Sequence, residues 1–181
     1  MVYLFLADGF EEIEALTPVD YLRRCKIEVQ TVSVKPEKTV TGSHGIPVTA
    51  DITIDQVDRE KIQAVILPGG MPGTLNLEQC EPLQQLIDFC AEQGKLLGAI
   101  CAAPSILGHK GLLSGKKATC YTGFETALTG AEYTGAPVER DGNMITARGA
   151  GVAGQFAFAL AEALVGKEAV KALKAGILWE E

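Results

Sequence analysis

Short apolar segments divide the first hundred residues of the chain. Residues 2–7, 63–67 and 95–100 are almost continuously apolar, and residues 27–34 are rich in β-branched side chains. Uninterrupted apolar runs of this length are typical of strands that are buried on both faces of a parallel sheet. β-Branched side chains also favour the pleated strand over the helix. The pattern therefore predicts four buried strands in this half of the chain.

The segments between and after these strands carry apolar residues at helical spacing. Residues 10–24 and 82–93 repeat apolar positions about every three residues, which predicts amphipathic helices. Residues 152–165 predict a strongly apolar helix and residues 167–174 a shorter one. Alternating strands and helices favour an α/β fold, with a doubly wound, mostly parallel sheet covered by helices on both faces.

The remaining segments predict shorter strands. In residues 35–55, apolar and polar positions alternate over short stretches, which indicates a small antiparallel excursion from the main sheet. Residues 117–121 predict a further strand. Residues 138–140 and 144–147 predict a hairpin across an Asp-Gly turn. Without a linker, a repeat or a low-complexity tract, we expect a single domain over residues 1–181.

The composition is that of a soluble globular protein, with 47% hydrophobic and 22% charged residues. Sixteen basic against 23 acidic residues give a net charge of −7 without a basic run, which argues against nucleic-acid binding. The chain enters a strand at once, without the basic start of a signal peptide. Its apolar stretch at residues 156–161 is too short to span a bilayer. We expect a cytoplasmic protein that binds no membrane.

The cysteines and histidines predict neither a disulfide framework nor a metal site. Five widely spaced cysteines, with no Cys-x-x-Cys, do not fit a set of pairs. His44 and His109 lie near no second ligand type at metal spacing. In a reducing compartment, four of the cysteines are expected to be packing residues. These four are Cys25, Cys80, Cys90 and Cys120.

Cys101 differs from the other cysteines in its position. It follows the apolar strand at 95–100 and precedes a helical segment at 102–107, in which Pro104 is acceptable in the first turn. A sharp strand-to-helix turn of this kind is typical of a nucleophile elbow. The positive end of a helix is expected to lower the pKa of the thiol. The alternative from spacing alone is a buried, inert cysteine.

A glycine-rich stretch is a further candidate for the same site. In residues 68–73 (Pro-Gly-Gly-Met-Pro-Gly), Gly69 and Gly70 permit backbone angles at which successive N–H groups point at an anion. Together with the N–H of Ala102 they could form an oxyanion hole. The alternative is a tight turn after the strand at 63–67.

Glu14 is the candidate acid. Glu11, Glu12 and Glu14 all lie at the start of the first predicted helix, where carboxylates favour the helix dipole. Glu14 has apolar neighbours on both sides, so an inward orientation would desolvate it. Desolvation would raise its pKa and suit it to general acid–base catalysis.

The stretch at residues 149–154 is a literal G-x-G-x-x-G that precedes a helix. A dinucleotide site also needs a further strand with an acidic residue near its end, roughly 20 residues on. Here the rest of the chain is helical, so we expect no nicotinamide or flavin cofactor. The glycines are expected instead to let a helix end approach the site closely.

Four motifs carry a family resemblance. They are residues 8–14 (Asp-Gly-Phe-Glu-Glu-Ile-Glu), 67–70 (Leu-Pro-Gly-Gly), 99–104 (Ala-Ile-Cys-Ala-Ala-Pro) and 148–151 (Arg-Gly-Ala-Gly). In this order the chain resembles the ThiJ/PfpI superfamily, and within it the branch of the Parkinson-disease protein DJ-one. The resemblance covers essentially the whole chain. It implies a flavodoxin-like fold of the class I glutamine amidotransferase-like type, usually as a homodimer.

The resemblance also implies roles for single residues. Cys101 matches the reactive cysteine, Glu14 the carboxylic acid that hydrogen-bonds it, and Gly70 and Ala102 the oxyanion-hole donors. Some relatives carry histidine directly after the cysteine or at the position of Tyr121, and this chain has neither. His109 would lie about 12 Å from Cys101 along a regular helix, too far to act as its base. A Cys-His-acid triad is therefore not expected.

Two functions of different classes remain open. The first is a cofactor-independent glyoxalase or deglycase that acts on methylglyoxal and related 2-oxoaldehydes through Cys101 and Glu14. The second is an oxidative-stress sensor or chaperone-like protein in which Cys101 oxidises to sulfinate. A third is another cysteine-dependent lyase or hydratase, since a fold does not determine a substrate.

Overall fold

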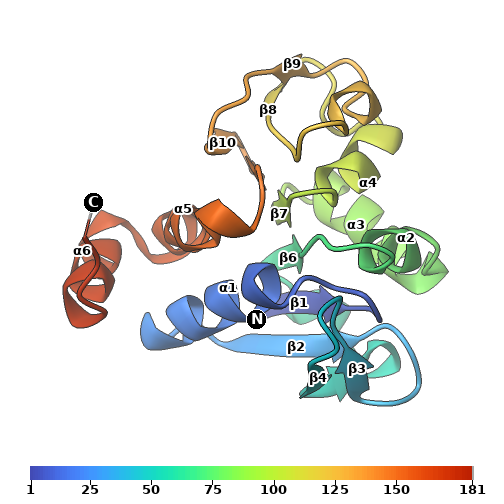
Figure 1. Cartoon of the computed structure of the whole chain (residues 1–181), viewed down its shortest axis with the longest axis horizontal. Coiled ribbons are helices and arrows are strands. Elements are labelled where there is room, and N and C mark those ends of the chain that lie inside the picture. The colour runs from blue at the N-terminus through green and yellow to red at the C-terminus, as the bar shows by residue number, and fades with distance from the viewer. Residues whose placement is uncertain (181) are drawn as a thin grey trace.

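A seven-stranded sheet runs through the centre of the computed structural model, which describes residues 1–180 (Figure 1). In spatial order its strands are β10 (Val138–Asp141), β11 (Met144–Ala147), β7 (Leu96–Ile100), β6 (Ala64–Leu67), β1 (Val2–Leu6), β2 (Val29–Ser33) and β5 (Ile52–Thr53). Every neighbouring pair is parallel except the β10–β11 hairpin. This confirms the predicted flavodoxin-like α/β fold with a mostly parallel sheet.

Helices cover both faces of the sheet. One face holds α1 (Glu12–Arg24), α5 (Ala153–Val165) and α6 (Lys167–Gly176). The opposite face holds α2 (Gly73–Glu78), α3 (Glu81–Glu92) and α4 (Pro104–His109). Within β1, Leu4 and Leu6 belong to the first core and Tyr3 and Phe5 to the second, because successive side chains of a strand point to opposite faces. Two cores explain why the sheet-forming runs are apolar throughout.

Two small sheets lie outside the central one. β3 (Thr39–Thr41) and β4 (Pro47–Thr49) form the antiparallel excursion that the sequence predicts. β8 (Lys117–Ala118) and β9 (Glu132–Tyr133) form a short parallel pair. No helix within residues 1–180 combines the length and the apolar character that crossing a membrane requires.

Several predicted boundaries are wrong, and long-range hydrogen bonds explain two of them. The first helix begins at Glu12 instead of residue 10, because the N–H of Glu11 bonds to the carbonyl of Gly69. The strand predicted at 117–121 ends at Ala118, and the N–H of Tyr121 turns to the carbonyl of Cys101. The helix after Cys101 begins at Pro104 instead of residue 102. The sequence analysis also missed α2, which directly follows a turn rich in glycine and proline.

Candidate active site

The candidate site lies where four parallel strands end side by side. β11, β7, β6 and β1 are consecutive neighbours in the sheet, and their carboxyl ends share one edge. Ligands of open α/β sheets bind at this edge. The loops that follow these strands carry the four sequence motifs, so the fold brings together stretches that are far apart in the chain.

Cys101 sits on a strained turn directly after β7. Its φ of 65° lies in the left-handed region, which non-glycine residues rarely adopt. Its N–H donates to the carbonyl of Ala147 at 2.9 Å, and its own carbonyl accepts from the N–H of Tyr121 at 2.8 Å. These two hydrogen bonds fix the backbone of the turn to the segments on either side of it. The position from which the half-buried side chain of Cys101 projects is therefore fixed as well.

Glu14 reaches the same point from α1. Its side chain is only 1% exposed, and Oε2 accepts a hydrogen bond from the N–H of Gly69 at 2.9 Å. The carboxyl also hydrogen-bonds the thiol of Cys101 and accepts from the N–H of Ala150. Glu11 caps the helix by accepting from the backbone N–H of Glu14 at 2.7 Å. The carboxyl of Glu14 is therefore buried against the cysteine.

Two backbone N–H groups face the sulfur of Cys101. They belong to Gly70 and Ala102, and both favour negative charge on the sulfur. Gly70 has a φ of 89°, and a Cβ there would lie 2.5 Å from the carbonyl oxygen of Gly9. At Gly69 a Cβ would lie 2.6 Å from the Cβ of Cys101. Gly69 is thus required for the close approach of this loop to the cysteine, and Gly70 for its close approach to the backbone of residues 9–11.

The electrostatics of Cys101 differ from the expectation. Burial, the charge of Glu14 and the hydrogen bond to Glu14 raise the pKa of the Cys101 thiol to about 12. The N–H groups of Gly70 and Ala102 oppose this rise without cancelling it. The expected lowering of the pKa by the helix start is wrong, because burial of the thiol and the carboxylate beside it outweigh the helix dipole.

Glu14 has a raised pKa, as its apolar neighbours predict. Burial raises the pKa of its carboxyl from 4.5 to about 7, against the hydrogen bond from Cys101, and the charge of Glu11 adds to the rise. Two negative charges in contact repel strongly, so the pair retains one proton near neutral pH. The pair can pass this proton between sulfur and carboxylate, which is the requirement for a nucleophile with its own base.

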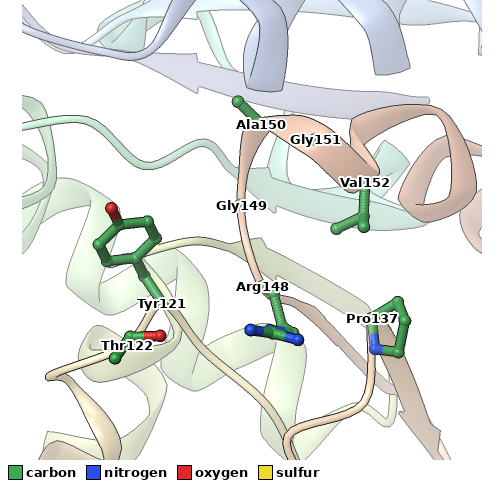
Figure 2. A pocket seen from close by; sticks show the side chains of 8 residues that line it. All are labelled: Tyr121, Thr122, Pro137, Arg148, Gly149, Ala150, Gly151 and Val152. Atoms are coloured by element: carbon green, nitrogen blue, oxygen red, sulfur yellow. The ribbon is translucent and has the colours of Figure 1, made fainter.

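An open pocket of about 340 Å³ adjoins the pair. Figure 2 shows Tyr121 and Thr122 on one side of it and the segment from Arg148 to Val152 on the other. A Cβ on Gly149 would lie 3.3 Å from the ring of Tyr121 and 3.8 Å from Oε1 of Glu14. The lack of a side chain at Gly149 therefore leaves room for the ring of Tyr121 and the carboxyl of Glu14 close to its backbone.

The two histidines lie in contacts that the sequence analysis did not predict. Nδ1 of His44 lies 2.8 Å from Oε2 of Glu12 and 3.9 Å from Oε1 of Glu11. Burial raises the pKa of Glu12, but hydrogen bonds from the side chain and backbone of His44 lower it to about 2. This contact ties the β3–β4 hairpin to α1. His109 instead pairs with Glu78 at 2.6 Å.

His44 thus lies close to two carboxylates that are distant from it in the sequence. Glu11, Glu12 and His44 have potential ligand atoms within 4.8 Å of one another. The contact joins residues more than thirty positions apart, so local spacing could not reveal it. Sequence reasoning also missed the N–H of Ala150 as a donor to Glu14, although the glycines beside it predicted a close approach.

Comparison with known protein families shows to which family the chain belongs. The model of the DJ-1/PfpI family matches residues 1–163. The chain belongs to the DJ-1/PfpI family. Among solved family structures, oxidised DJ-1 from Toxoplasma gondii superposes with a TM-score of 0.95 at 35% identity, covering 99% of this chain and 98% of that one.

Curated relatives in the family include proteins from plants and archaea. "Protein DJ-1 homolog B" of Arabidopsis thaliana is 38% identical over 169 residues. The match covers 92% of this chain but only 39% of the plant protein. "Deglycase PH1704" of Pyrococcus horikoshii is 36% identical over 152 residues, which cover 82% of this chain and 90% of the archaeal one.

Proposed function

We propose that this protein is a cofactor-independent glyoxalase or deglycase-type enzyme that converts 2-oxoaldehydes such as methylglyoxal to 2-hydroxy acids. The contact that carries the proposal is the hydrogen bond between Glu14 and Cys101, with the N–H groups of Gly70 and Ala102 at the sulfur. The name of the Pyrococcus relative, a deglycase, supports the deglycase-type alternative within this proposal.

The first step is the addition of the cysteine to the aldehyde. Glu14 takes the thiol proton while the sulfur of Cys101 forms a bond to the aldehyde carbon. The electron pair of the C=O bond moves to the oxygen, which the N–H groups of Gly70 and Ala102 stabilise. Protonation of this oxygen by Glu14 completes a hemithioacetal. Glu14 is then a carboxylate again, ready for the next step.

The second step moves a proton between the two carbons of the substrate. Glu14 removes the hydrogen from the former aldehyde carbon as a proton, which gives an enediolate. The hydroxyl proton on this carbon passes to the oxygen of the neighbouring carbon, and Glu14 returns its own proton to the neighbouring carbon itself. The product is a thioester of the 2-hydroxy acid on Cys101. Water then releases the acid and restores the thiol. The net reaction consumes one water and needs no oxidant or reductant.

A redox function is the second candidate. Hydrogen peroxide would oxidise the Cys101 sulfur through sulfenic to sulfinic acid. The same N–H groups that face the sulfur could bind the sulfinate oxygens, and a protonated Glu14 could donate to them. The solved Toxoplasma relative is described as oxidised, which favours keeping this candidate.

The decisive assay is formation of lactate from methylglyoxal. Under the enzyme proposal, Cys101→Ser abolishes turnover, whereas Cys25→Ser retains it. Cys25 is the matched control because it is also a half-buried cysteine but lies at the far end of α1. Lactate formation that survives Cys101→Ser would contradict the proposal, and so would an absence of turnover in the unmodified protein.

A further inference from the structure

Arg148 stands out among the arginines because its guanidinium lines the pocket beside the candidate site and has no partner within residues 1–180. Within residues 1–180, it makes no hydrogen bond or ion pair and it is exposed. By contrast, Arg23 bonds Asp51 at 2.6 Å and Arg24 bonds Asp20 at 2.7 Å. An unpaired guanidinium at the edge of a pocket is available to bind an anion in a bidentate manner.

The pocket that Arg148 lines lies beside the reacting pair, because residues that line it also contact Cys101 and Glu14. Arg148 is followed by Gly149, where a Cβ would lie close to both the ring of Tyr121 and the carboxyl of Glu14. The next residue, Ala150, donates its N–H to Glu14. Arg148 is therefore two residues along the chain from a backbone group that contacts the reacting carboxyl.

The rest of the pocket is uncharged. Arg148 is the single charged residue among those that line it, and Tyr121, Pro137 and Val152 supply apolar surface (Figure 2). The chain as a whole carries a net charge of −7, so this local cation is not part of a general basic surface. One guanidinium without a second cation matches the single charge of a carboxylate better than a doubly charged phosphate.

We propose that this pocket selects 2-oxoaldehydes whose far end carries a carboxylate, with Arg148 as the residue that binds the carboxylate. The inference rests on the proposed glyoxalase function and specifies its substrate class. The probe is 4,5-dioxopentanoate, a 2-oxoaldehyde with a terminal carboxylate. Addition of one water converts it to 2-hydroxyglutarate. The matched neutral probe is 2-oxopentanal, which has a methyl group in place of the carboxylate.

The experiment compares kcat/KM for the two probes in the unmodified protein and in three variants. Arg148→Met should lower the preference for the charged probe about tenfold, as expected for loss of one exposed charge-assisted bond. The change should appear in KM, and Arg148→Lys should restore part of it. Arg140→Met is the matched control, because Arg140 is also exposed and unpaired within residues 1–180 but does not line the pocket.

Mass spectrometry of the intact protein after each assay must show that the aldehydes have left the arginines unmodified. If 2-oxopentanal is turned over but Arg148→Met leaves the preference unchanged, the inference is wrong while the proposed function stands. If neither probe is turned over, the proposed function fails. Calorimetric binding of 2-hydroxyglutarate then decides the inference: binding that Arg148→Met weakens supports it, and absent or unaffected binding overturns it.

Discussion

The buried carboxyl of Glu14 makes the stability of the protein depend on pH in a predictable direction. Its pKa is about 7 in the folded chain and returns to 4.5 on unfolding. The folded state therefore binds this proton more tightly than the unfolded state does. The contribution of Glu14 to stability is highest below pH 4.5 and declines as the pH rises from 4.5 to 7. Replacement by an uncharged residue should remove this decline.

The size of the effect follows from the two pKa values. One pH unit corresponds to ~1.36 kcal/mol, so ionising Glu14 in the folded state costs ~3 kcal/mol. The side chain is 1% exposed, so solvent screening reduces this cost little. Between pH 5 and pH 8, the unfolding free energy of Glu14→Gln should therefore rise by about 2–3 kcal/mol relative to that of the unmodified protein.

Urea unfolding of both proteins at pH 5 and pH 8 measures this difference. Altered hydrogen bonds to Gly69 and Ala150 can shift the unfolding free energy of the variant by the same amount at both pH values. Such a shift does not affect the result, because only the change in unfolding free energy between pH 5 and pH 8 is compared. Glu132→Gln, at an exposed carboxylate, is the control and should change by less than about 0.5 kcal/mol. Equal offsets at both pH values for Glu14→Gln would refute a raised pKa at this carboxyl.

Three further predictions concern the site and the assembly. Gly69→Ala should lower methylglyoxal turnover at least about 100-fold, because the new Cβ would lie 2.6 Å from the Cβ of Cys101. Gly176→Ala is the control and should leave turnover unchanged, because a Cβ there meets no neighbour within 4 Å. We propose that the protein is a homodimer, because of the family resemblance and the exposed side chain of Ile13. Light scattering should therefore give twice the chain mass of 19.2 kDa, and the mass of a monomer would contradict the proposal. Under mild peroxide, peptide mass spectrometry should find sulfinate at Cys101 before the other cysteines, because Glu14 can take the thiol proton despite the raised pKa of Cys101. Earlier oxidation of Cys25 would contradict that order.

The local pattern of the chain was sufficient to predict the sheet, its main helices and the stretches that meet at the candidate site. Apolar runs and helical spacing act over a few residues, and parallel topology then places the carboxyl ends of neighbouring strands together. The elbow at Cys101 and the glycines at 69 and 70 were identified in this way. The roles of these residues remain predictions until activity is measured.

Properties set by distant neighbours could not be predicted from the sequence. The pKa of Cys101 is raised by burial and by a carboxylate that another helix supplies, so the position of the cysteine near α4 gave the wrong sign. The contact of His44 with Glu12 likewise depends on how a hairpin folds back onto α1. The exact start of α4 at Pro104 depends on how the elbow is held by Ala147 and Tyr121.

The most direct test of the central claim is turnover of methylglyoxal by Glu14→Gln. Glutamine keeps a hydrogen-bonding side chain of the same size but cannot accept and return a proton. If Glu14 moves the proton between the two substrate carbons, lactate formation should fall by about 10²–10⁴-fold, the range for a lost general acid–base. Full turnover in Glu14→Gln would contradict the mechanism at its central step.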